Sequence, residues 1–226
     1  MRLAAAVLAL LALPAFAARP LTTEDASILE DKDCQLEAWL DFAHEATQGW
    51  FVPACNFGGH IEWQIGFART RAQGESHFSD AYAQAKSAWR LGEGPWSLGG
   101  VAGVVRRGPE APVRRWDNPY LLAIATGEFG DLMAHANLGW SRVRETGRDL
   151  TPWGVALEYA VHPRVTVLGE AFGVTGESPF LRAGLRHAAI ERRLDLDISV
   201  VTRLHGSRSE RLLSIGFLYQ APRLIP

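Results

Sequence analysis

The feature that most constrains this chain is an alternation of apolar and polar residues, repeated from Cys34 almost to the C-terminus. Residues 60–68 show it clearly, with Ile61, Trp63, Ile65 and Phe67 alternating with His60, Glu62 and Gln64. A period of two residues places neighbouring side chains on opposite faces of an extended strand. The chain is therefore predicted to fold into strands that have one apolar and one polar face.

Twelve segments fit strands of this kind: 34–44, 50–57, 59–70, 78–91, 95–106, 119–127, 131–143, 152–161, 164–174, 179–188, 193–203 and 211–220. Two of them fit less well than the rest. Pro53 interrupts the second segment, and 119–127 is apolar on both faces. Proline lacks the backbone N–H that a ladder needs, so it is expected at edges or irregularities.

The connections between the predicted strands alternate in length. Polar, mostly longer loops are expected at 45–48, 71–76, 106–118, 144–151 and 204–210, and tight turns at 57–59, 92–94, 128–130 and 162–163. Long loops on one rim and short turns on the other are typical of outer-membrane barrels, with the short turns in the periplasm. The predicted fold is an all-β, transmembrane, antiparallel up-and-down β-barrel of about 12 strands, with both termini in the periplasm.

A soluble β-sandwich or a lipocalin-like barrel would have the same periodicity, with its apolar face turned inward. Three features favour the membrane barrel: the apolar faces are broad and aromatic, the opposite faces mix Gly and Ala with charges, and hairpins connect the strands throughout. The eight tryptophans suit the aromatic girdles at a membrane interface, although they also suit a sandwich core.

The first 17 residues are predicted to be a cleavable export signal. Arg2 forms a short positive region, residues 3–13 are apolar, and Ala15-Phe16-Ala17 is a small-x-small cleavage site. Residues 18–33 are polar and are expected to form a periplasmic segment that tucks into the barrel mouth, ahead of a barrel over 34–226. The predicted location is the bacterial outer membrane.

The two cysteines, Cys34 and Cys55, are predicted to form a disulfide. Exported proteins meet an oxidising compartment. If the first hairpin turns at His44-Glu45, residue 34 lies opposite residue 55, and their Cα atoms lie about 4.5–5.5 Å apart. Two unpaired thiols are the alternative.

Residues 19–26 (Arg-Pro-Leu-Thr-Thr-Glu-Asp-Ala), followed by Gln35-Leu36-Glu37, resemble the start of the outer-membrane proteins named for the meta-pathway of phenol degradation. Residues 194–197 (Leu-Asp-Leu-Asp) resemble that family's penultimate strand. The resemblance implies an outer-membrane barrel, sometimes proposed to take up hydrophobic or aromatic compounds. The chain ends in residues 220–226 rather than on an aromatic residue, so Phe217 or Tyr219 would have to serve the barrel-assembly machinery as the insertion signal.

The polar side chains of the predicted strands should line the barrel interior. They are Gln35, Glu37, Asp41, Glu62, Gln64, Gln84, Lys86, Glu158, Glu170, Arg182, Arg186, Asp195 and Asp197. Charges enclosed in a barrel must be paired or hydrated. The set predicts either a polar conduit for small solutes or a salt-bridged plug that closes the barrel, and twelve strands are compatible with both.

The protein is predicted not to be an enzyme, and no metal site or cofactor is predicted. His135, Asn137 and Ser141 share one strand face, but a step of two residues separates side chains by almost ~7 Å, too far for a direct triad. The sequence has no Gly-x-Ser-x-Gly elbow and no metal-spaced histidine pair. A lipid-active barrel enzyme is thus the least favoured reading.

The basic stretch with Arg106, Arg107, Arg114, Arg115 and Trp116 would lie outside the cell. It is either a solvated loop or a site for the phosphates of lipopolysaccharide, because arginine binds phosphate well. The expected partners are outer-membrane lipids, the assembly machinery and a small solute. The net charge of −2 argues against nucleic acid.

Overall fold

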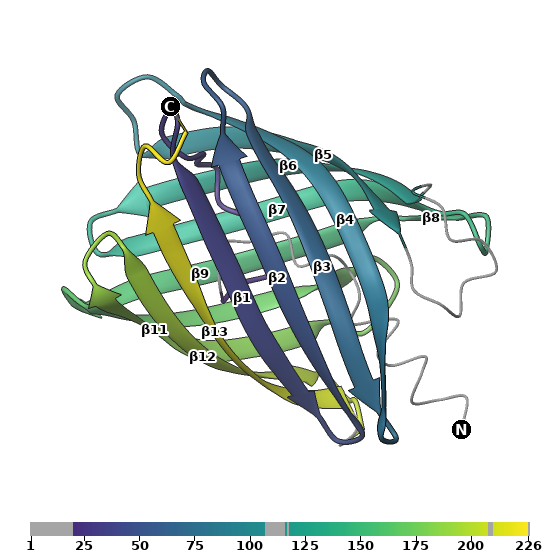
Figure 1. Ribbon diagram of the computed structural model, residues 1–226. Coiled ribbons are helices and arrows are strands. Elements are labelled where there is room, and N and C mark those ends of the chain that lie inside the picture. Colours follow the sequence, from purple (N-terminus) through teal and green to yellow (C-terminus); the bar gives the residue numbers. More distant parts are fainter. Residues whose placement is uncertain (1–19, 107–115, 117, 208–209, 226) are drawn as a thin grey trace.

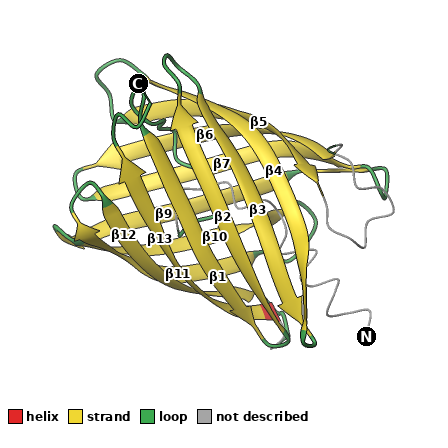
Figure 2. Cartoon of the chain, in the orientation of Figure 1, coloured by secondary structure: helices red, strands yellow, loops and turns green. Residues whose placement is uncertain are grey.

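In the computed structural model the chain forms a closed antiparallel β-barrel (Figures 1 and 2). The structure describes residues 20–106, 116, 118–207 and 210–225. The strands within these ranges are β1 (Cys34–Ala43), β2 (Ala46–Asn56), β3 (Glu62–Ala72), β4 (Glu75–Arg90), β5 (Trp96–Arg106), β6 (Asn118–Phe129), β7 (Leu132–Val143), β8 (Arg148–Leu150), β9 (Pro152–His162), β10 (Val165–Val174), β11 (Phe180–Ile190), β12 (Leu194–Arg203) and β13 (Arg211–Ala221). The predicted signal peptide, residues 1–17, lies outside the described residues.

Strands β1–β7 and β9–β13 pair in sequence order, β7 pairs with β9, and β1 pairs with β13 to close the ring. The short β8 and the longer β9 both pair with β7, and only Thr151 separates them. They therefore act as one strand with a break at Pro152, where the backbone has no N–H to donate. Counted this way the barrel has 12 strands, which confirms the predicted fold class.

The two faces of the wall differ as the alternation predicted. In β9, Leu157 is 54% exposed, while its neighbour Glu158 is 5% exposed. Large apolar side chains cover the outside of most strands, whereas carboxylates, amides and bases are buried on the inside. A soluble protein buries its apolar face, so this inverted arrangement requires a lipid environment around the barrel. No helix in the described part of the chain is long and apolar enough to cross a membrane.

Several strands extend further than the sequence predicted, so two connections are shorter. The expected loop 71–76 contracts to Gln73 and Gly74, and most of 45–48 belongs to β2. Gln73 and Gly74 both have positive φ, 52° and 85°, the geometry of the tight hairpin turns that match strand twist. Pro53 interrupts the ladder between β2 and β3, but the register on either side is unchanged.

The barrel interior contains aromatic residues, which the predicted inward set omitted. Trp39 and Trp50 stack inside with ring centroids 5.6 Å apart, and Tyr82 lies 5.9 Å from Trp50. The polar ends of the two tryptophans are satisfied, since Trp39 donates to Asp41 at 3.0 Å and Trp50 donates to Gln48 at 2.9 Å. An aromatic ring can thus occupy a polar face when its N–H finds an acceptor.

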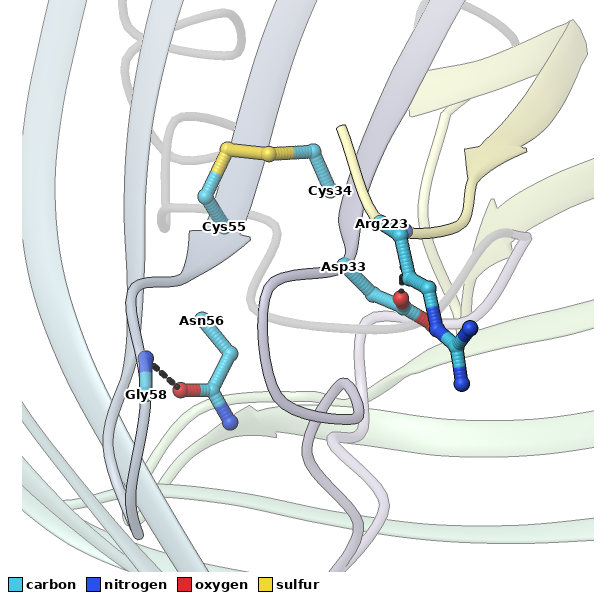
Figure 3. Close-up of a disulfide and its surroundings, with 6 residues drawn as sticks. All are labelled: Asp33, Cys34, Cys55, Asn56, Gly58 and Arg223. Atoms are coloured by element: carbon cyan, nitrogen blue, oxygen red, sulfur yellow. Dashed lines mark hydrogen bonds between the residues drawn. A yellow bond between two sulfur atoms is a disulfide. The ribbon is translucent and has the colours of Figure 1, made fainter. Parts of the chain in front are cut away.

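Cys34 and Cys55 lie opposite each other in the register of β1 and β2 and form a disulfide, with Cα atoms 4.1 Å apart (Figure 3). The hairpin turns at His44-Glu45, as predicted. The bond closes a loop with a sequence separation of 21 residues.

Replacing both cysteines by serine should lower the free energy of unfolding by about 2–4 kcal/mol, because the unfolded chain then regains the entropy of the open loop. The change is measured by urea unfolding, with the folded fraction read from the shifted mobility of the barrel on unheated gels. An unchanged urea midpoint would show that the β1–β2 ladder alone restrains this loop.

Candidate functional site in the barrel interior

The N-terminal segment, defined here as residues 20–29, lies inside the barrel rather than only at its mouth (Figure 1). Pro20, Leu21, Thr23 and Glu24 are each almost completely buried. The segment forms no strand, and side chains of the barrel wall satisfy its backbone. It therefore reaches deeper than the periplasmic position that the sequence suggested.

Inward side chains from four strands accept hydrogen bonds from the segment's backbone. Glu170 of β10 accepts from the N–H groups of Thr22 and Thr23 and from the Thr23 hydroxyl. Further along, the acceptors are Asn137 of β7 for Glu24, Thr126 of β6 for Ala26 at 2.8 Å, and Glu62 of β3 for Leu29 at 2.9 Å. Asn137 also donates to the Glu24 carbonyl at 3.0 Å. The wall thus recognises the segment along its length.

Lys86 of β4 forms the ionic contact at the centre of the segment. Its Nζ lies 2.7 Å from Glu24 and 2.9 Å from Asp25, and the Lys86 side chain is only 6% exposed. Gln84 of the same strand donates to Glu24 at 3.3 Å. Removing one partner would leave a buried charge unpaired, which costs free energy. The contact therefore holds the segment and the wall together.

An inward glycine provides space that the segment occupies. A Cβ on Gly154 of β9 would overlap the Thr23 hydroxyl. The wall at β9 therefore leaves room for Thr23 only because residue 154 has no side chain.

The substitution Gly154→Leu should push the segment out of the lumen, because overpacking costs about 1–3 kcal/mol, or roughly a 5–150-fold shift between docked and released states. Limited proteolysis near residues 20–29 measures release. Gly169→Leu is the matched control, since Gly169 lies on the lipid face of β10 with open space around it. Equal cleavage of both variants and of the wild type would contradict steric docking at Gly154.

The predicted inward residues beyond this contact lie along one wall. Glu170 pairs with Arg182 at 3.7 Å, and Glu158 pairs with Arg186. Glu170 and Arg182 are direct cross-strand partners in β10 and β11, and Glu158 reaches Arg186 across β10 alone. These ion pairs run along the wall and do not bridge the lumen.

The remaining predicted residues also lie on the inner face. Glu37, Gln64 and Asp197 are buried, while Gln35, Asp41 and Asp195 are partly exposed. Gln35 donates to Glu37 at 3.2 Å, and Gln84 donates to Gln64 at 2.7 Å. The sequence did not predict the contacts of Thr126 and Asn137 with the segment, or the space that Gly154 leaves for it. A glycine or threonine on a polar strand face is too common to single out.

The segment borders two compartments of the barrel interior. A polar cleft of about 390 Å³, at the end where β1 begins and β13 ends, is lined by Glu24, Asp25, Glu62 and Lys86, among others. A smaller cavity of about 60 Å³ toward the other end is lined by Thr22, Thr23 and mostly apolar residues, including Tyr120, Leu122 and Phe172. Thr22 and Thr23 thus border the smaller cavity, and the next two residues, Glu24 and Asp25, border the cleft.

The base of the segment is clamped next to the disulfide (Figure 3). The Asn56 side chain donates to the Leu29 carbonyl at 2.7 Å and accepts from Gly58 at 3.0 Å. The Arg223 N–H donates to the Asp33 carboxylate at 2.7 Å, which joins the C-terminal tail to the same point. These contacts anchor residues 29–33, which lead from the segment into β1.

His135 has structural partners rather than a nucleophile from its own strand. Its Nδ1 lies 3.0 Å from the Thr126 hydroxyl, and its Nε2 lies 3.6 Å from Glu158. Ser141 instead lines the smaller cavity. The described residues contain no cluster of three or more His, Cys, Asp or Glu that could hold a metal ion.

The Glu24 contact makes docking of the segment sensitive to pH. Burial raises the pKa of the Glu24 carboxyl from 4.5 to about 7; Asp25 and Glu62 add to the rise, and Lys86 partly offsets it. The docked carboxyl holds its proton more tightly than the released one, so this contribution is complete at low pH and is lost as pH rises through 7. Docking should weaken by up to about 3 kcal/mol between pH 5 and pH 8.

Limited proteolysis at pH 5 and pH 8 measures how readily the segment is released, and it should show more release at pH 8. The pKa of Asp25 lies below its ordinary 3.8, so Asp25 contributes outside this window. Glu24→Gln should remove most of the pH dependence, and Glu128→Gln, at an exposed ion pair with Arg90, should not. A segment held more firmly at pH 8 than at pH 5 would refute the assignment to Glu24.

Comparison with known proteins places this arrangement in context. A family model described as uncharacterised conserved protein UCP029691 matches residues 6–218. No curated protein sequence matches the chain. The matching family model does not confirm the resemblance of residues 19–26 and 35–37 to the phenol meta-pathway family. Membership of that family stays a prediction.

Several solved outer-membrane channels have the same fold. The KdgM porin superposes with a TM-score of 0.60 at 11% identity, covering 82% of this chain and 98% of that one. The NanC porin gives 0.59 at 8% identity over 82% and 98%. An outer membrane channel from Pseudomonas putida F1 gives 0.57 at 12% identity over 87% and 98%. At such low identity the likeness shows the fold alone.

Proposed function

We propose that this chain, which belongs to that family of uncharacterised conserved proteins, is an outer-membrane channel for small solutes that its own N-terminal segment holds closed. The observation that carries the proposal is that consecutive residues of the segment border two different compartments, Thr22 and Thr23 the smaller cavity and Glu24 and Asp25 the polar cleft. We expect removal of the segment to join the two. The porin-like fold and the lipid-facing apolar wall support the outer membrane as the location.

The nature of the segment's contacts favours a closed channel over a permanently filled barrel. Its backbone is held mainly by side-chain hydrogen bonds and by the Lys86 ion pairs, all of which water can replace on release. The Glu–Arg pairs that would close a structural barrel run along the wall instead of across it. The barrel is thus occluded by a movable element and not by its wall.

The solute class follows from the compartments. The polar cleft toward the periplasm suits hydrated solutes, whereas the smaller cavity presents Tyr120, Leu122 and Phe172. A small solute with an apolar or aromatic part fits both surfaces. The structural or surface-binding barrel is the alternative, and it predicts no flux at all. A lipid-active enzyme has no supporting observation.

Liposome swelling tests the channel with the mature, refolded protein. A size series of neutral solutes, with and without an aromatic ring, should give slow flux that is faster for aromatic solutes of equal mass. Heat-modifiable gel mobility confirms that the barrel is folded. A folded protein that passes no solute, even after the segment is released by Gly154→Leu, would leave the structural barrel.

Export and insertion complete the proposal. Cleavage near Ala17 would expose the residues that lead into the segment, and Phe217 or Tyr219 on β13 would present the aromatic signal to the assembly machinery. Both aromatic residues precede the tail that binds Asp33.

A further inference from the structure

Three outward-facing arginines gather where β3, β4 and β5 approach the rim opposite the start of β1 and the end of β13. Arg69 and Arg71 belong to β3, and Arg106 ends β5. Phe78 of β4 lies between them, because Arg69 is its cross-strand partner and the Arg106 guanidinium lies 5.2 Å from its ring centroid. We call Arg69, Arg71, Arg106 and Phe78 the basic patch. The rest of the basic stretch that the sequence singled out, 107–115, lies outside the described residues.

The basic patch carries charge that the described residues do not neutralise. No ion pair among them involves Arg69, Arg71 or Arg106, whereas Arg142 and Arg203 on the same rim pair with carboxylates. The Arg69 Nε donates to the Ser76 hydroxyl at 2.8 Å, which orients one guanidinium. Glu75, at the tip of the same hairpin, forms no ion pair with them. Clustered guanidiniums of this kind suit a phosphate, which they can contact with two parallel N–H groups each.

An apolar groove of about 740 Å³ lies on the lipid face, and its lining extends from Val104, next to Arg106 on the outward face of β5, to Cys55 and Phe57 near the end where β1 begins. Its floor is formed by small outward side chains of β4 and β5, and bulky side chains of the flanking strands form its sides: Ala83, Ala85, Ala102 and Val104, with Trp63, Ile65, Leu121 and Trp140. Arg106 occupies the outward position that follows Val104 on β5, so one end of the groove opens onto the patch.

We propose that the patch and groove together bind a phosphorylated, acylated glycolipid of the outer leaflet, the lipid A part of lipopolysaccharide. Its phosphates contact Arg69 and Arg106, and one acyl chain lies in the groove. The rim is the outer one, because the start of β1 and the end of β13 lie side by side at the opposite end of the barrel, which faces the periplasm in barrels of this kind. The charged basic patch matches the phosphates of such a lipid, and the apolar groove matches its acyl chains.

Native mass spectrometry of the mature protein in neutral detergent tests the assignment. Diphosphoryl lipid A, monophosphoryl lipid A and phosphatidylglycerol are the three probes. The wild type should bind one diphosphoryl lipid A at least tenfold more tightly than phosphatidylglycerol, with the monophosphoryl form between them. The double variant Arg69→Gln, Arg106→Gln should lose that preference.

A second variant separates the two parts of the site. Ala83→Phe with Ala102→Phe fills the groove and should weaken all three lipids while it leaves the order of preference. Arg164→Gln, at the periplasmic turn between β9 and β10, is the control and should bind as the wild type does. Equal affinity for lipid A and phosphatidylglycerol, or unchanged binding in the Arg69 and Arg106 double variant, would overturn the proposal.

Discussion

Replacing residues 20–29 by a glycine-serine sequence of equal length should convert a nearly silent barrel into a conducting one. The change removes the carboxylates that Lys86 holds and the apolar side chain of Leu21, while the clamp at Asn56 and the disulfide stay in place. Docking a flexible glycine-serine linker would cost conformational entropy, and the linker has no side-chain contacts to offset that cost. We expect single-channel conductance, or the fraction of time open, to rise at least tenfold.

Planar-bilayer recording of the refolded protein measures this directly, with wild type and variant compared at the same salt. Heat-modifiable mobility must be equal in both, so that a misfolded barrel is not mistaken for an open one. Equal conductance of the two proteins would show that residues 20–29 do not limit flow.

The second large effect is expected from Lys86→Met. Methionine leaves Glu24 and Asp25 buried without the cation that both contact, a change that typically costs about 3–5 kcal/mol. Glu62, which accepts from Leu29, loses the same nearby charge. The barrel wall keeps its backbone ladder, so the cost falls on docking of the segment, and release should rise by two orders of magnitude or more.

Arg90→Met is the matched control on the same strand. Arg90 pairs with Glu128 at 3.2 Å, but both side chains are about half exposed, and such surface pairs contribute about 0–1 kcal/mol. Protease sensitivity of the N-terminal segment should therefore rise in Lys86→Met and not in Arg90→Met. If both variants resist protease as the wild type does, Lys86 does not hold the segment.

The strand pattern could be predicted because a period of two is a local property of the sequence. The outward Leu157 and the inward Glu158 follow from alternation alone, and so does the pairing of Cys34 with Cys55 once the hairpin turn is known. The sequence underestimated strand length at Gln73-Gly74, because a two-residue turn and a polar loop have the same composition.

The lumen was only partly predictable. Alternation identified Glu62, Lys86 and Glu170 as inward, but it could not say what they contact. Glu170 binds Thr23 from 147 residues away, and Lys86 binds Glu24 from 62 residues away. The segment itself has no periodicity, and its position depends on side chains from six separate strands. The inward positions of Trp39 and Trp50 were not predicted, because an aromatic residue on a polar face breaks the expected pattern.

The central claim is that residues 20–29 block the lumen and must leave it for flow. A disulfide between Cys substitutions at Ala26 and Thr126 tests it, because the Ala26 N–H lies 2.8 Å from the Thr126 hydroxyl. Bilayer conductance is recorded for the oxidised and the reduced double variant, with the wild type and Thr126→Cys under the same reductant. The account predicts that the oxidised variant is silent and that reduction restores wild-type openings. An oxidised variant that conducts as the reduced one does would contradict it.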